Sequence, residues 1–139
     1  MKSFLIKVLL DYKDVVYRDL LIAENSRLDA VHHLIKSAFG FKGNEFASFI
    51  HENEEWETEV EIPLENLGDE EISMMKDVVL TEIMKEVGDQ LSYTYDYASE
   101  WKFYLELIEV KTSSSEVVPP TVMKKHGIPP QESERSITG

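Results

Sequence analysis

The residues best suited to chemistry gather in one stretch, LSYTYDYASEWKFYLELIEV, which runs from Leu91 to Val110. Its one aspartate, Asp96, stands among tyrosines and shortly before Trp101. A carboxylate in this setting can hold a cation, act as a general acid or base, or accept a hydrogen bond from a ligand. It can also accept the N–H groups of a turn, which is a common role of aspartate.

The elements that must position these residues are two strands of a hairpin. Apolar and polar residues alternate on both sides of Asp96, which is the pattern of half-buried strands. The tyrosines on one strand can meet the apolar residues on the next in the core. Rings that are buried while their hydroxyls stay wet would suit a groove or a subunit interface. The residues of this shared face are Tyr93, Tyr95, Tyr97, Trp101, Phe103, Leu105 and Leu107.

An earlier hairpin is predicted from FLIKVLL and DVVYRDLLI, with strands near residues 3–10 and 15–22. Arg18 lies inside the apolar second strand, where an unpaired charge would cost several kcal/mol. We therefore expect its guanidinium to contact the carboxylate of Asp96. The candidate ligand- or partner-binding site is Tyr17, Arg18, Tyr95, Asp96 and Trp101.

The stretch NSRLDAVHHLIKSAFG predicts the main helix, capped by Ser26 and ended by Gly40. Its apolar residues recur at helical spacing, so one face must pack on the sheet. His32 and His33 point about 100° apart on such a helix and cannot readily share one metal ion. We predict no metal site and no cofactor.

Three further segments complete the expected fold. EFASFIH and WETEVEI predict a second hairpin, in which Trp56, Val60 and Ile62 are buried and a row of glutamates marks an edge strand. VVLTEIMKEVGD predicts a short helix over residues 82–87, capped by Thr81. After Lys111 the apolar period ends, so residues 112–139 are expected to form an irregular tail, laid on the body or partly disordered.

Composition excludes several classes of function. The chain has 139 residues, no cysteine and a net charge of −13. The absence of cysteine excludes thiolate nucleophiles and disulfides, and it is compatible with the cytoplasm, where we expect the protein. The acidity opposes direct nucleic-acid binding. The sequence carries no run of apolar residues long enough for a membrane helix, no glycine-rich phosphate loop and no nucleophile elbow.

Several motifs together resemble a known family. They are VYRDLLI followed by LDAVHHLIKSAFGF, then LSYTYDYASEW, then a late GIPPQE. The order is similar to that of the plasmid pRiA4b ORF-3-like family, a transposon passenger or TnpR-like group without an established activity. That family shows Ala-Phe-Gly-Trp, Tyr-x-Tyr-Asp-Phe-Gly-Asp-x-Trp and Pro-Pro-Glu-Asp at the corresponding places. Here Ala98 and Ser99 replace the hairpin's glycine and second acid, and Phe103 stands where many members carry histidine.

These observations predict an α+β fold: a mixed, largely antiparallel sheet, one main helix on one face, a short second helix and the irregular tail. Residues 1–111 would form the single domain. The predicted function is a non-enzymatic module that binds a small ligand or a protein through the aromatic and acidic corner, as a monomer or homodimer. Two alternatives stay open, namely an enzyme with Asp96 as acid or base and an accessory protein of a mobile element.

Overall fold

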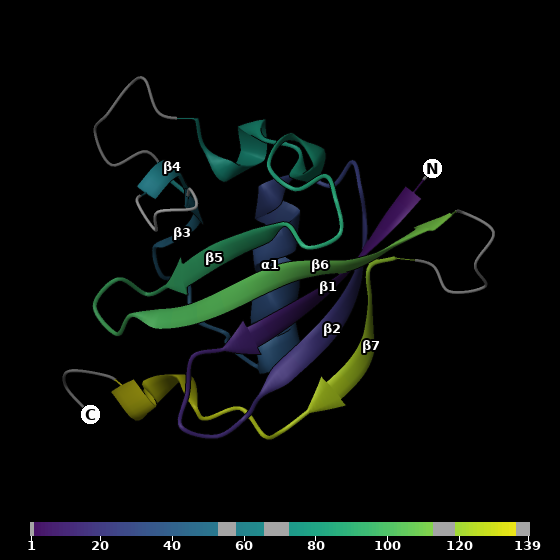
Figure 1. Cartoon of the computed structure of the whole chain (residues 1–139). Helices are drawn as coiled ribbons and strands as arrows, with labels where there is room; N and C mark the ends of the chain where they lie inside the picture. The colour runs from purple at the N-terminus through teal and green to yellow at the C-terminus, as the bar shows by residue number, and fades with distance from the viewer. Residues whose placement is uncertain (1, 53–57, 66–72, 113–118, 136–139) are drawn as a thin grey trace.

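A seven-stranded antiparallel sheet dominates the computed structural model, which describes residues 2–52, 58–65, 73–112 and 119–135. The strand order in this described part is β4-β3-β5-β6-β1-β2-β7 (Figure 1). Neighbouring strands pair antiparallel throughout, so the fold is a sheet-dominated α+β arrangement. The strands are β1 (Lys2–Leu10), β2 (Tyr17–Ala23), β3 (Ala47–Glu52), β4 (Thr58–Pro63), β5 (Gln90–Tyr95), β6 (Trp101–Thr112) and β7 (Thr121–His126).

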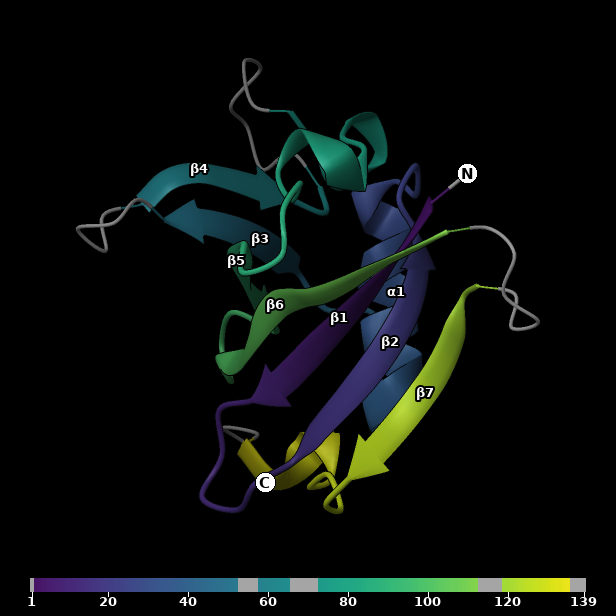
Figure 2. The same ribbon diagram turned by 45° about the vertical axis from the view of Figure 1, so that its right-hand side comes forward.

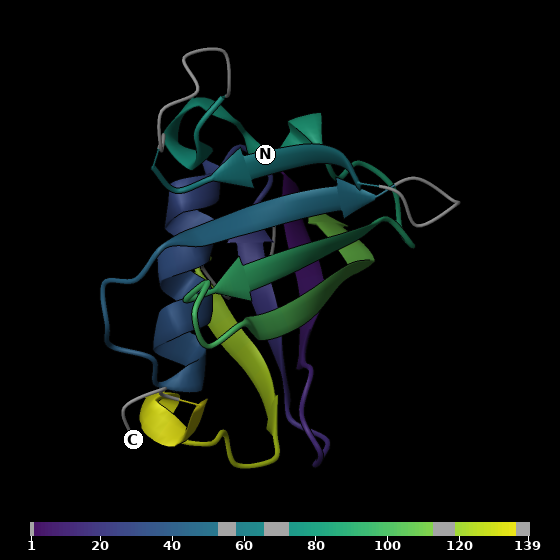
Figure 3. The ribbon, with the colours of Figure 1, turned by 90° about the vertical axis from the view of Figure 1, so that its left-hand side faces the viewer.

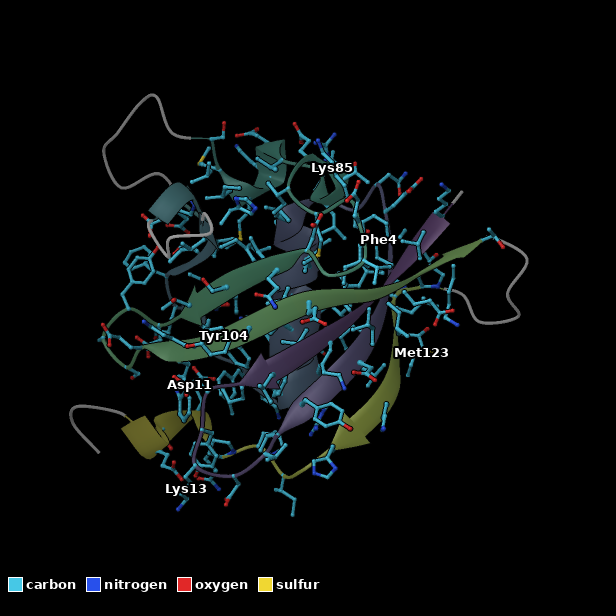
Figure 4. All side chains as sticks on the ribbon, viewed as in Figure 1. Phe4, Asp11, Lys13, Lys85, Tyr104 and Met123 are labelled. Carbon is cyan, nitrogen blue, oxygen red and sulfur yellow. The ribbon has the colours of Figure 1, made fainter. Side chains whose placement is uncertain are left out.

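The helix α1 (Leu28–Phe39) covers one face of the sheet (Figures 2 and 3). Its apolar stripe is buried as predicted, and the Phe39 ring meets the edge of Phe103 on β6 with ring centroids 4.8 Å apart. No described helix is long and apolar enough to cross a membrane. The opposite face of the sheet carries exposed side chains such as Tyr104, labelled in Figure 4.

The two ends of α1 differ from each other in how well the sequence predicts them. Gly40 ends the helix in the left-handed region, with φ 75°, and the N–H of Phe41 reaches the carbonyl of Lys36 at 2.8 Å. At the start, the predicted Ser26 cap is wrong, because Arg27 holds the N-cap position without a side-chain hydrogen bond. The backbone carbonyl of Val78 accepts the N–H of Leu28 instead, at 3.0 Å.

Two of the predicted hairpins, the first one and the one around Asp96, are confirmed. β1 pairs with β2, and β5 pairs with β6 so that Tyr95 faces Trp101 across the ladder. β4 lies at the edge of the sheet, as its glutamates predicted. Fewer side chains of β4 are buried than predicted, since Ile62 is buried while Val60 is 43% exposed. Trp56 lies outside the described residues.

The predicted short helix over residues 82–87 is wrong. The chain forms two 3-10 turns instead, η1 (Met75–Asp77) and η2 (Leu80–Glu82). The backbone N–H of Leu80 reaches the carbonyl of Ser26 at 2.8 Å, which ties this segment to the start of α1. Tertiary backbone contacts and the burial of Leu80 and Met84 therefore override a local preference for helix.

The predicted irregular tail is wrong for residues 121–126, which form β7 along the free edge of β2. Only Val122 of this strand packs against the core, so β7 lacks the apolar alternation that reveals a strand in a sequence. A 3-10 turn, η3 (Glu132–Arg135), follows, and Figure 3 shows it beside the C-terminal end of α1. Residues 121–135 thus extend the sheet and then cross its end.

Arg18 fastens three of these elements together from a buried position. Its guanidinium and Nε donate to the carbonyls of Tyr17, His126, Gly127 and Ala38 over 2.8–3.2 Å. Ala38 lies in the last turn of α1, where carbonyls lack helical partners and the helix dipole is negative. Burial lowers the pKa of Arg18 from its usual 12.5, yet an arginine keeps its charge in proteins. One cation therefore joins β2, the end of α1 and the end of β7.

Replacing this cation should destabilise the fold. We expect Arg18→Met to lower the free energy of unfolding by about 2–4 kcal/mol, because several carbonyls lose a charged donor. Urea denaturation measures the change. The matched control is Lys125→Met, since Lys125 is exposed and lies directly across the ladder from Arg18. The control should change stability by less than about 0.5 kcal/mol. Equal losses in the two variants would mean that Arg18 does not act as a clamp, that is, it does not stabilise the contact between β2, the end of α1 and the end of β7.

Candidate functional site

The five residues of the predicted site do not form one cluster. Tyr95 and Trp101 lie opposite each other at the end of the β5–β6 ladder, and Asp96 begins the turn between them. Arg18 and Tyr17 belong to β2, where consecutive side chains point to opposite faces of the sheet. Tyr17 stacks on His126 at 5.1 Å, and the Lys7 ammonium lies 4.0 Å from the Tyr17 ring centroid.

Asp96 has a structural role in its own turn. Its φ of 61° is in the left-handed region, which aspartate tolerates better than most residues. One carboxylate oxygen accepts the N–H groups of Ala98 and Ser99 at 3.2 and 3.5 Å. The backbone N–H of Asp96 also reaches the carbonyl of Phe46 at 2.7 Å, which ties the turn to the start of β3.

The predicted contact between Arg18 and Asp96 is wrong. Each of the four hydrogen bonds that Arg18 makes within the described part of the chain ends on a backbone carbonyl. A buried guanidinium still needs compensating partners. The carbonyls at the ends of α1 and β7 supply that compensation in place of an acid.

Tyr95 and Trp101 are joined by a residue that sequence reasoning placed in the tail. The Tyr95 hydroxyl donates to Oε2 of Glu132 at 2.9 Å, and the Trp101 indole N–H donates to the Glu132 carbonyl at 3.2 Å. Both rings are fully buried. The centroid of the Phe41 ring lies 5.7 Å from that of Tyr95 and 5.2 Å from that of Trp101. Burial, with Glu132 as a further cause, raises the pKa of the Tyr95 hydroxyl.

The other carboxylate oxygen of Glu132 lies on the loop that follows α1. Oε1 accepts the backbone N–H of Lys42 at 2.8 Å and that of Gly43 at 3.1 Å. One carboxylate thus receives three donors from two parts of the chain. The motif GIPPQE was the only signal in the sequence that could have pointed to Glu132, and no motif marked Gly43.

A buried pair of polar groups lies beside this corner. His32 Nδ1 and the Tyr93 hydroxyl are 2.5 Å apart, and both residues are inaccessible to solvent. Burial, with His33 and Lys36 nearby, lowers the pKa of His32 to about 4, and burial raises the pKa of Tyr93. At neutral pH a neutral phenol and a neutral imidazole therefore share this hydrogen bond. Among the described residues, no group of three His, Asp or Glu side chains could hold a metal ion.

Comparison with known proteins shows the family and the fold to which the chain belongs. The model of the plasmid pRiA4b ORF-3-like proteins matches residues 2–139. The chain belongs to this family. No curated protein matches it. A solved structure, a protein of unknown function named MM3350 from Methanosarcina mazei Go1, shares the fold with a TM-score of 0.79. Its sequence is 17% identical, and the match covers 94% of this chain and 73% of that protein.

Three of the motifs that resemble the family meet at one place in this structure. Phe41 comes from the Ala-Phe-Gly segment, Tyr95 and Trp101 from the hairpin motif, and Glu132 from the Pro-Pro segment. They gather at the end of the β5–β6 ladder, next to the C-terminal end of α1. We therefore take this corner, rather than Asp96 alone, as the candidate functional site.

Substitutions of Asp96 separate a structural role from a chemical one. Asp96→Asn should leave stability within about 0.5 kcal/mol, because asparagine adopts positive φ and can accept the same N–H groups. Asp96→Ala should cost about 1–2 kcal/mol, since it loses those acceptors and strains the backbone. Thermal or urea unfolding checks both variants. A large loss in the asparagine variant would show that the negative charge itself is required.

His32 should make stability depend on pH. Its pKa is about 4 when folded and about 6.5 in a model peptide, so the unfolded chain binds the additional proton between these values. Stability is therefore fully present above pH 6.5 and falls as the pH drops towards 4, by up to about 3 kcal/mol from this group. Denaturant unfolding across this range should show a weaker pH dependence in His32→Gln. Parallel curves for the two proteins would contradict the assignment.

Proposed function

We propose that the protein is a non-enzymatic module that binds a protein partner on the surface formed by the β5–β6 turn and the start of β3, which adjoins this corner. The ionisable groups of the corner support a binding role over catalysis. Asp96 accepts N–H groups of its own turn, and the Tyr95 hydroxyl donates to Glu132. A general acid or base needs a group that can exchange a proton with a substrate, and both are engaged in structural hydrogen bonds.

One observation carries the proposal, namely a pair of exposed aromatic rings on this surface. Phe46 and Tyr97 stack with ring centroids 6.0 Å apart and an interplanar angle of 26°. Phe46 is 45% exposed and Tyr97 37% exposed. The Tyr97 hydroxyl donates to the carbonyl of Ala47 at 3.2 Å, which holds its ring in place. Ordered aromatic rings with exposed area are the residues most enriched at protein interfaces and their hot spots.

The partner is a protein or a second copy of the chain, and the expected compartment is the cytoplasm. The enzyme alternative is less well supported, because Asp96 is committed to its turn. The mobile-element alternative draws support only from the family resemblance. A net charge of −13 opposes direct contact with a phosphate backbone.

Site-specific photo-cross-linking in the host cell tests the proposal. A photoreactive amino acid at position 97 of the full-length chain should give a discrete adduct, whose partner is then identified by mass spectrometry. The matched control position is 104, because Tyr104 is 47% exposed on the sheet face that α1 leaves open. With the purified partner, Phe46→Ala combined with Tyr97→Ala should weaken binding at least about tenfold, while stability stays nearly unchanged.

Two results would contradict the proposal. One is an absence of adducts at position 97 beyond those at position 104. The other is a purified partner whose affinity is the same for the wild type and the double variant. An adduct at position 97 whose partner proves to be the chain itself would identify the module as a homodimer.

A further inference from the structure

The loop after α1 and the end of β5 form a carboxylate-binding nest. Its donors are the backbone N–H groups of Lys42 and Gly43 and the hydroxyl of Tyr95, all directed at Glu132 over 2.8–3.1 Å. Successive backbone N–H groups that converge in this way form a concave site for anions. The donors carry no formal charge, so the nest selects by geometry.

Gly43 leaves the room that the carboxylate needs. A Cβ atom at this position would lie 2.4 Å from Oε2 of Glu132 and 2.8 Å from the Tyr95 hydroxyl. Any side chain here would therefore collide with the bound carboxylate. The nest exists in its present form only because residue 43 is glycine.

The nest also recognises the backbone of the residue that it binds. The Trp101 indole N–H donates to the carbonyl of Glu132, while the buried rings of Trp101, Tyr95 and Phe41 form an aromatic cluster beside it. A free carboxylate ion would satisfy only the three donors of the nest. A glutamate within a peptide satisfies the indole as well, so this geometry suits a peptide segment.

Residues 127–135, which we call the strap, hold Glu132 in this place with few apolar contacts. Ile128 is 88% exposed, and Gln131, Ser133 and Glu134 are exposed too. Glu134 supplies a second side-chain anchor, because its carboxylate accepts the Tyr12 hydroxyl at 2.8 Å, and Arg18 donates to the carbonyl of Gly127 at the start of the strap. A segment held by a few polar contacts belongs to the least stable part of a fold and opens locally at low cost.

We propose that the nest is a binding site for a glutamate at the start of a tight turn in a partner protein, and that the strap, whose Glu132 begins η3, occupies this site in cis. The partner segment presents a glutamate whose side chain enters the nest and whose carbonyl accepts the Trp101 indole N–H. The strap leaves when the partner enters. The inference names a second contact of the module, and it does not depend on the aromatic pair Phe46 and Tyr97.

Because the strap is attached to the chain, it competes strongly with a partner segment for the nest. A strap attached to the chain competes with an effective concentration on the order of millimolar. A partner segment with the same contacts therefore binds the wild type weakly, and it binds tightly once the strap has lost its anchor. Removal of the Glu132 carboxylate should accordingly increase affinity in trans at least about tenfold.

The experiment uses full-length protein and a fluorescent peptide with the sequence of residues 127–135, GIPPQESER. Fluorescence anisotropy should show that Glu132→Ala binds this peptide at least tenfold more tightly than the wild type does. A peptide carrying Glu132→Gln should bind the same variant at least tenfold more weakly. The matched control is Ser133→Ala, which changes an exposed strap residue next to Glu132, leaves both carboxylate anchors in place and should bind like the wild type. Adding Gly43→Ala to Glu132→Ala should abolish binding, because the new methyl group fills the nest.

Equal affinity of the folded Glu132→Ala variant for both peptides, or no binding of either, would overturn the inference. Should Glu132→Ala fail to fold, titration of the wild type with several millimolar peptide decides the matter by NMR. The amide signals of Lys42 and Gly43 and the indole signal of Trp101 should then shift with the glutamate peptide and not with the glutamine peptide. Unchanged signals would equally overturn it. The Phe46→Ala, Tyr97→Ala variant should bind the peptides like the wild type, which separates this test from that of the aromatic pair.

Discussion

A buried arginine whose partners are carbonyl oxygens holds this fold together. Arg18 donates to the end of α1 through Ala38 and to the end of β7 through His126 and Gly127. These carbonyls need donors, because helix ends and strand ends leave backbone groups without regular partners. A carboxylate would satisfy the guanidinium but would leave those carbonyls unpaired. The Arg18 clamp therefore satisfies both the buried guanidinium and the carbonyls at these chain ends. Its contacts with His126 and Gly127 also fix the end of β7.

The end of β7 determines the route of the chain towards the corner. Gly127 has φ +81°, and a Cβ there would lie 2.3 Å from the carbonyl oxygen of Val15. Only glycine fits this approach, so the chain turns tightly against the start of β2. From that turn the strap crosses the end of the sheet and places Glu132 beside Tyr95 and Trp101. The position of the candidate site thus follows from the clamp, through one glycine and a short extended segment.

The sequence predicted the parts of the fold whose information is local. The first hairpin, the end of α1 at Gly40 and the hairpin around Asp96 each carry their pattern within a short window. β7 lacks such a pattern, because an edge strand with one partly buried apolar residue, Val122, shows no alternation. The period of two could have separated Tyr17 from Arg18, since adjacent residues of a strand point to opposite faces.

The candidate site was only half visible in the sequence, for a physical reason. Tyr95 and Trp101 stood out as aromatic residues, whereas the donors on Lys42 and Gly43 are backbone groups that every residue possesses. Backbone recognition also suits a chain with 27 acidic residues. A site built on lysine side chains would attract all of these carboxylates at long range. Uncharged N–H dipoles act only at hydrogen-bonding distance and in a fixed direction, so they admit a carboxylate that the fold delivers in the right orientation. The selection of Glu132 among so many acids therefore rests on the path of the strap, which the arginine clamp and Gly127 define.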